Sequence, residues 1–138
     1  MPFQTGTTAG TLTFTAQLGG ATDRQTVTIP AAPVGITATQ AVRSPGSIEV
    51  RVTGFDNTRT VGALTFTFYD AAGSPVAPGA IRADATADFA RYFQTSDLGG
   101  VFLLRALFPV TGDASGINTF EVQLTNSAGT ARTARTAF

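Results

Sequence analysis

The side chains that most often perform covalent chemistry are missing from this 138-residue sequence. It contains no His, no Cys and no Lys, and all nine basic residues are Arg. An imidazole base, a thiolate nucleophile, a Schiff-base amine and the soft ligands of zinc or copper sites are therefore absent. The sequence predicts a protein that is not an enzyme and that uses no cofactor.

Oxygen-bearing side chains gather in two segments where the chain is expected to turn. Residues 56–59 read DNTR, and Asp113, Ser115 and Asn118 follow a glycine. Carboxylate and amide oxygens are ligands of calcium, which makes Asp113 and Asn118 the candidate metal ligands. Their spacing does not match the EF-hand loop, so turns closed by Asp and Asn side chains are the favoured interpretation.

Two carboxylates on predicted strands are the remaining candidates for acid and base catalysis. Glu49 and Glu121 are flanked by Arg51 and Gln123, and nothing in the pattern indicates that either carboxylate is buried. Pairing with arginines at the surface is the favoured interpretation of both. Arg105 interrupts an apolar strand, and we expect it to form an ion pair with Glu49.

Aromatic side chains suggest a third kind of site, a platform on which a sugar could stack. Its candidate members are Phe3, Phe55, Tyr69 and Tyr92. Trp, the usual stacking residue, is absent. Phe89, Tyr92 and Phe93 follow helical spacing, and a short helix that covers the sandwich explains them more simply.

Composition limits the class of protein and its partners. Hydrophobic residues make up 43% of the chain and charged residues 13%, which is enough for a real core. Nine basic residues balance nine acidic ones, so binding to nucleic acid is not expected. The longest apolar stretch, residues 101–110, is interrupted by Arg105 and Pro109 and is shorter than the roughly 20 residues of a membrane helix. No membrane insertion is predicted.

Alternation of apolar and polar residues is the dominant pattern, and it predicts an all-β protein. The expected strands are residues 11–18, 26–29, 34–42, 48–53, 64–69, 102–108, 120–125 and 130–137. One short helix is expected around residues 89–93, behind the caps Asp84 and Thr86. Because residues 102–108 carry apolar side chains on both faces, we expect that strand to be central in its sheet.

Two motifs resemble bacterial immunoglobulin-like domains. The closing stretch FEVQLTNSAGT, residues 120–130, resembles the terminal hairpin of these domains, and YDAAGSPV, residues 69–76, is similar to a turn of the same surface repeats. The resemblance covers residues 34–138. It implies an immunoglobulin-like antiparallel β-sandwich with one short helix, in a secreted or cell-surface protein.

Residues 1–33 form a separate unit in this interpretation. They are expected to make an N-terminal β-hairpin followed by the linker Pro-Ala-Ala-Pro, which is typical of a junction between modules. The hairpin would be either the tail of a preceding repeat or a strand pair that completes the sheet of a neighbour. Its apolar face, expected to mediate self-assembly, comprises Leu12, Phe14, Val27 and Ile29.

The functional expectation is an extracellular or cell-surface module that is structural or mediates interactions. Its partners would be neighbouring domains, copies of itself, or a surface glycan or protein. A first alternative is a filament subunit, a homo-oligomer joined by strand addition through the N-terminal hairpin. A second alternative is a carbohydrate-binding module with a role in adhesion.

Overall fold

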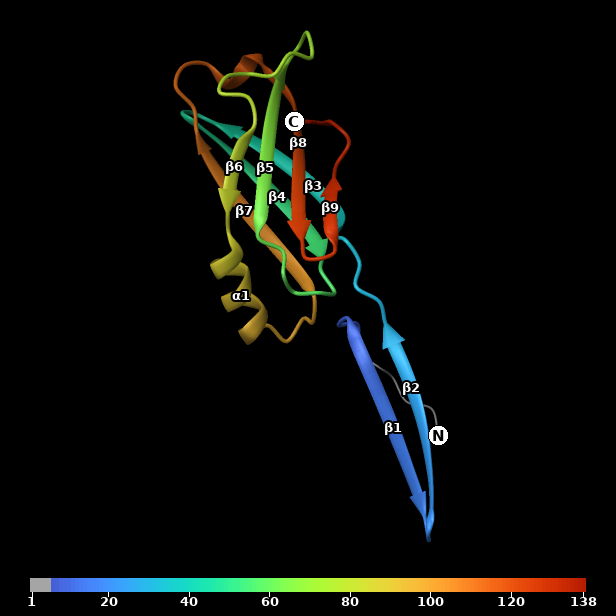
Figure 1. Ribbon diagram of the computed structural model, residues 1–138. Coiled ribbons are helices and arrows are strands. Elements are labelled where there is room, and N and C mark those ends of the chain that lie inside the picture. The colour runs from blue at the N-terminus through green and yellow to red at the C-terminus, as the bar shows by residue number, and fades with distance from the viewer. Residues whose placement is uncertain (1–5) are drawn as a thin grey trace.

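The computed structural model describes residues 6–138, which are mostly β-strand (Figure 1). The described strands are β1 (Gly10–Leu18), β2 (Ala21–Ile29), β3 (Gly35–Ser44), β4 (Ser47–Phe55), β5 (Ala63–Asp70), β6 (Ile81–Asp84), β7 (Val101–Pro109), β8 (Ile117–Asn126), β9 (Gly129–Arg132) and β10 (Thr136–Ala137). The helix α1 spans Thr86–Thr95, and a short 3-10 turn, η1, spans Ala114–Gly116. The prediction of an all-β chain with one short helix is confirmed.

Two antiparallel sheets form a sandwich from residues 34–138. One sheet has the order β3-β4-β7. The other has the order β10-β8-β5-β6, with β9 also paired to β8. This arrangement is that of an immunoglobulin-like sandwich, in which the first, second and fifth strands lie in one sheet and the third, sixth and seventh in the other. The fourth strand of this sandwich, β6, pairs with β5, and the helix α1 follows it in the chain.

The core lies between the two sheets and follows from the alternation in their strands. Every second residue of β4 and of β8 faces inward. The inward residues of these two strands are Ile48, Val50, Val52, Phe120, Val122 and Leu124, none more than 1% exposed. Burial of apolar area is the main stabilising contribution, at roughly 25 cal/mol per Å².

Strand β7 corrects one sequence-based expectation, because it lies at the edge of its sheet and not at the centre. Its inward residues, such as Phe102, contribute to the core as expected. Its outward residues Leu103 and Leu107 are 67% and 65% exposed. Apolar residues on both faces predicted burial on both faces, but nothing covers the outer face of this sheet within the described residues.

Helix α1 packs beside β7 through the aromatic face that its spacing predicted. Phe89 and Phe93 are buried, and both rings contact Phe102 edge-on, with centroids 5.2 and 6.4 Å apart. The Tyr92 hydroxyl donates to the carbonyl of Val101 at 3.0 Å. Of the expected caps, Asp84 is the residue that accepts a hydrogen bond from the helix start, at the Thr86 nitrogen.

The hairpin of β1 and β2 stands apart from the sandwich (Figure 1). It extends from the end of the sandwich at which β8 turns into β9, and the marked C-terminus lies toward the opposite end. The hairpin forms a two-stranded sheet of its own, with nine residues in each strand. Its turn comprises only Gly19 and Gly20, which is tighter than the sequence indicated. The boundary predicted between residues 33 and 34 stays a prediction.

Candidate functional site

Glu49 and Glu121 do not share a site. Each alternates with buried residues, so the two carboxylates lie on the outer faces of opposite sheets. Glu121 pairs with Arg132 at 2.5 Å. Glu49 accepts hydrogen bonds from Arg105 at 2.7 Å and from Arg51 at 2.5 Å, which confirms the expected pair with Arg105. These bonds, that from Arg105 first, lower the pKa of Glu49.

The calcium candidates form a turn. The Asp113 carboxylate accepts hydrogen bonds from the Ser115 nitrogen at 2.8 Å and the Ser115 hydroxyl at 2.5 Å, which begins the turn η1. Asn118 lies exposed at the start of β8. Within residues 6–138 no three side chains of His, Cys, Asp or Glu gather as a metal site would require.

The aromatic platform is not assembled among the described residues. Tyr69 is only 5% exposed, and the guanidinium of Arg135 lies 3.7 Å from the centre of its ring. Tyr92 packs with the helix against Phe93. Phe3 lies outside the described residues. A sugar therefore finds no shared stacking surface on Tyr69 and Tyr92.

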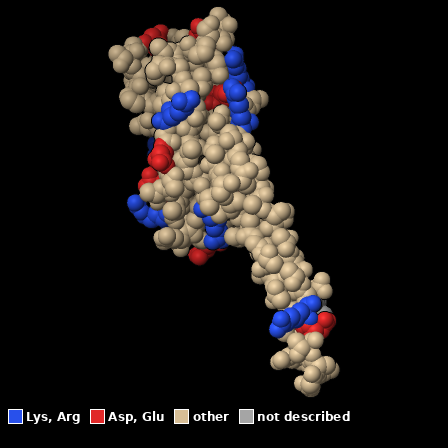
Figure 2. Space-filling model, in the orientation of Figure 1, with Lys and Arg blue, Asp and Glu red and all other residues tan. Residues whose placement is uncertain are grey.

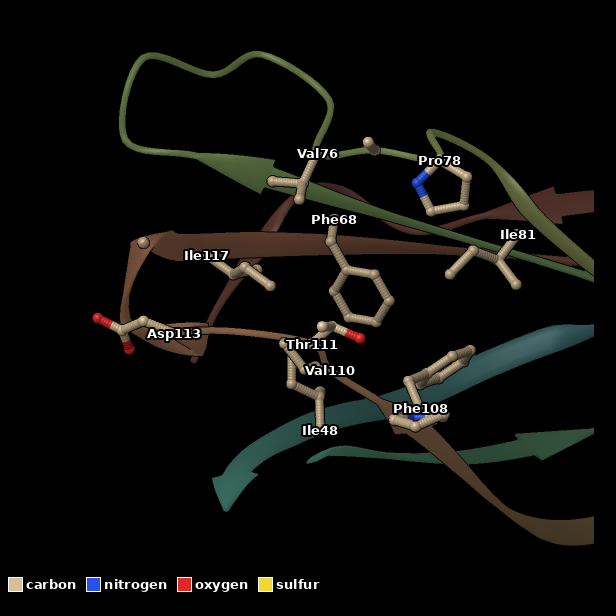
Figure 3. A pocket seen from close by; sticks show the side chains of 13 residues that line it. Ile48, Phe68, Val76, Pro78, Ile81, Phe108, Val110, Thr111, Asp113 and Ile117 are labelled. Atoms are coloured by element: carbon tan, nitrogen blue, oxygen red, sulfur yellow. The ribbon is translucent and has the colours of Figure 1, made fainter. Parts of the chain in front are cut away.

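An open hollow of about 490 Å³ lies between the sheets, at the end opposite the hairpin (Figure 3). Its labelled side chains are mostly apolar and include Phe68 and Phe108, whose rings meet edge-on at 5.1 Å. Asp113 lies at its rim, with the carboxylate directed away from the other side chains, and is already bonded to Ser115. The polar side chains in its lining are those of Thr111 and Asp113.

The most elaborate polar arrangement lies at the end of the sandwich from which the hairpin leaves. Asp56 is 0% exposed, and its carboxylate accepts five hydrogen bonds. The donors are the backbone nitrogens of Thr58, Thr60 and Val61, the Thr58 hydroxyl and the Asn126 side-chain amide, at 2.7 to 2.9 Å. Asp56 therefore ties the 56–61 loop to the turn between β8 and β9.

Two buried amides extend this network to the linker before β3. The Asn57 side chain donates to the Pro30 carbonyl at 2.8 Å and accepts from the Ala32 nitrogen at 3.1 Å. The Asn126 amide nitrogen donates to the Ala32 carbonyl at 2.8 Å while it also contacts Asp56. We call Asp56, Asn57 and Asn126 the junction triad. The triad donates hydrogen bonds to two backbone carbonyls of the linker and accepts one from a backbone nitrogen of the linker.

The Asn57 backbone also contacts the other strand of the hairpin. Its carbonyl accepts a hydrogen bond from the Ala9 nitrogen at 2.8 Å, just before β1 begins. Both ends of the hairpin therefore attach to the same residue of the sandwich. Two points of attachment restrict rotation about the linker in a way that a single covalent connection does not.

The ionisation state of Asp56 suits a structural role. Burial alone raises its pKa, but the hydrogen bonds donated by Thr58, Asn126 and Val61 outweigh that effect and hold the pKa below its usual value. The carboxylate therefore stays charged and acts only as an acceptor. A base or nucleophile needs free lone pairs near a substrate, and here five donors occupy the carboxylate.

The four residues expected to mediate self-assembly do lie on one face of the hairpin. Leu12 is directly opposite Val27, and Gly10 is opposite Ile29. Phe14 lies two residues after Leu12 in β1 and therefore on the same face. Leu12 is exposed, whereas Phe14, Val27 and Ile29 are half-buried. The only charged side chains of the hairpin are Asp23 and Arg24, and Figure 2 shows the rest of its visible surface as uncharged.

Sequence reasoning missed the junction triad. The sequence predicts a turn at residues 56–59, which is correct locally, and it places Asn126 in the closing hairpin. Their meeting depends on contacts between positions 70 residues apart. The available signal was the concentration of Asp and Asn at two turns that the sandwich topology places at the same end.

Helices of the described chain are all too short or too polar to cross a membrane. Comparisons with models of protein families, with curated proteins and with solved structures gave no match.

Proposed function

We propose that this protein is a non-enzymatic structural module of a secreted or cell-surface bacterial protein, and that it sets the spacing and direction between consecutive sandwiches. The observation that carries the proposal is the junction triad. A buried network of hydrogen bonds holds the linker and the base of the hairpin, so the element before the sandwich leaves it in a defined direction. The extracellular assignment rests on the resemblance to bacterial immunoglobulin-like repeats.

The positions of the chain ends favour this role. The linker enters at one end of the sandwich and the C-terminus lies toward the other (Figure 1). Modules connected in this way follow one another end to end, and the distance between their attachments is set by the length of a rigid sandwich.

Distances between two spin labels test the rigidity of the junction. The chain has no native cysteine, so Gln25→Cys in the hairpin and Gln94→Cys in α1, both exposed, provide unique attachment sites. Pulsed electron resonance should give one narrow distance distribution. Asn57→Ala should broaden it, whereas Asn118→Ala, which removes an exposed amide, should leave it narrow. An equally broad distribution in all three proteins contradicts the proposal.

Assembly through the hairpin is the second candidate function, because the hairpin stands clear of its own sandwich with Leu12 and Leu18 exposed. A filament subunit would increase in mass with concentration, and Leu18→Asp would suppress this increase. Sedimentation velocity of the full chain at several concentrations distinguishes the two functions. A monomer at every concentration contradicts the filament.

A further inference from the structure

The start of the chain repeats the sequence of strand β8. Residues 5–18 read TGTTAGTLTFTAQL and residues 111–124 read TGDASGINTFEVQL, so seven of fourteen positions are identical without a gap. The identical pairs are Thr5 and Thr111, Gly6 and Gly112, Gly10 and Gly116, Thr13 and Thr119, Phe14 and Phe120, Gln17 and Gln123, and Leu18 and Leu124. Alternation alone explains neither the two glycines nor the shared glutamine.

The distance between the two segments is that of one domain. Matching residues are 106 positions apart, and an immunoglobulin-like sandwich comprises about 100 residues. Both segments also lead into a tight antiparallel hairpin, in which Leu18 is opposite Ala21 and Leu124 is opposite Ala131. The two segments therefore correspond in sequence and in spacing, and each forms the first strand of an antiparallel hairpin.

Strand β8 shows what such a sequence does in a complete sandwich. It is hydrogen-bonded to β5 on one side and to β9 and β10 on the other. Phe120, Val122 and Leu124 face the core and are 1%, 0% and 0% exposed. Their counterparts in β1 are Phe14, Ala16 and Leu18, also alternate residues on one face.

Strand β1 has fewer neighbouring strands than β8 among the described residues. Among the described strands it pairs with β2 alone. Leu18, the counterpart of the fully buried Leu124, is 87% exposed. The hairpin thus carries the sequence of a core strand in a position where there is no core.

We infer that β1 and β2 are the closing hairpin of another sandwich of this kind, whose remaining strands resemble residues 34–110 and precede β1 in the same polypeptide. The counterpart of β5 would pair with β1 on the side away from β2, and the counterpart of the β3-β4-β7 sheet would cover the exposed Leu18. This inference rests on the proposed function and identifies the neighbour that the junction orients.

A second copy of this chain is a poorer partner for the hairpin. In every copy the edge of β5 that would receive β1 is already paired with β8 along eight residues. Insertion of the hairpin there would require a strand of the core to leave. The geometry thus favours a preceding set of strands that has no closing hairpin of its own.

A duplicated chain tests the inference directly. Residues 1–110 are joined to residues 5–138, so that a second hairpin of β1 and β2 follows β7 just as β8 does in the native chain. Amide hydrogen exchange of β1 in this internal position should be slower than in the 138-residue chain by about 100-fold or more. Leu18→Ala in the internal hairpin should reverse most of this protection, and the same change in the 138-residue chain should have no effect on exchange.

The control joins residues 1–138 to residues 34–138, so that the native β8 and β9 close both sandwiches. Two folded sandwiches in the control, together with rapid exchange of the internal β1 in the duplicated chain, would overturn the inference. A dimer of the 138-residue chain with a protected hairpin would also overturn it, because the partner would then be a second copy. Neither result alters the narrow spin-label distance expected at the junction, so the two proposals fail separately.

Discussion

Two hairpins of related sequence have opposite environments in this molecule. The hairpin of β8 and β9 lies in a sheet of the sandwich, and its Leu124 is completely buried. The hairpin of β1 and β2 is a separate two-stranded sheet, and its Leu18 is 87% exposed. A strand sequence therefore specifies which face is apolar, but the other strands of the sheet decide whether that face becomes a core.

The largest expected difference comes from the same substitution in each hairpin. Leu124→Ala removes a buried side chain and leaves a cavity, and we expect it to lower the free energy of unfolding by about 3 kcal/mol. Leu18→Ala should change it by less than about 0.5 kcal/mol, since the side chain lies in solvent. Urea unfolding followed by far-ultraviolet circular dichroism measures both. Similar losses would show that the hairpin packs against its own sandwich.

The second effect concerns how the β8 and β9 hairpin is anchored at its turn. Asp56→Ala removes the acceptor of five hydrogen bonds and leaves buried donors without partners, so the free energy of unfolding should fall by about 3 kcal/mol or slightly less. Asp113→Ala is the matched control, because it removes an exposed carboxylate from a turn. Equal unfolding midpoints for the two variants would contradict the structural role of Asp56.

Acid should weaken the same anchor. Because the pKa of Asp56 is lower in the folded than in the unfolded chain, its stabilising contribution is fully present above its usual value of 3.8 and is lost as the pH falls through the folded value. Thermal unfolding between pH 2 and pH 6 should show this loss below about pH 4. Asp56→Asn, which cannot ionise, should give a flatter profile, and an unchanged slope in that variant would assign the loss to other carboxylates.

The smallest effect is expected at the base of the β1 and β2 hairpin. Asn57→Ala removes one hydrogen bond to Pro30 and one from Ala32, and it should cost the sandwich about 1 kcal/mol. Amide exchange at Ala32 should become faster, whereas exchange in β4 should not. If Ala32 remains protected in the variant, the linker is held by something other than Asn57.

Much of the fold could be predicted from local sequence. Alternation predicted most of the strands, helical spacing of Phe89, Tyr92 and Phe93 predicted α1, and glycines marked the hairpin turns. The pair of Glu49 with Arg105 could be predicted because an arginine that interrupts an apolar strand needs a nearby carboxylate. These features depend on neighbours in the chain or on one adjacent strand.

Other features could not be predicted because they depend on long-range placement. Strand β7 lies at the edge because only β4 pairs with it, and a two-faced apolar pattern is the same in an edge strand as in a central one. The short strand β6 was missed, and the expected last strand is divided into β9 and β10. Four residues lack the length over which alternation can be recognised.

By itself the sequence determined that the chain is all β and that it contains no His, Cys or Lys. Only the tertiary structure brought Asp56, Asn57 and Asn126 together at the linker, and only it showed that Leu18 of β1 is exposed. The physical reason is the same in both cases. Alternation and composition are local properties, whereas burial and hydrogen-bond partners depend on which distant strands the fold places alongside.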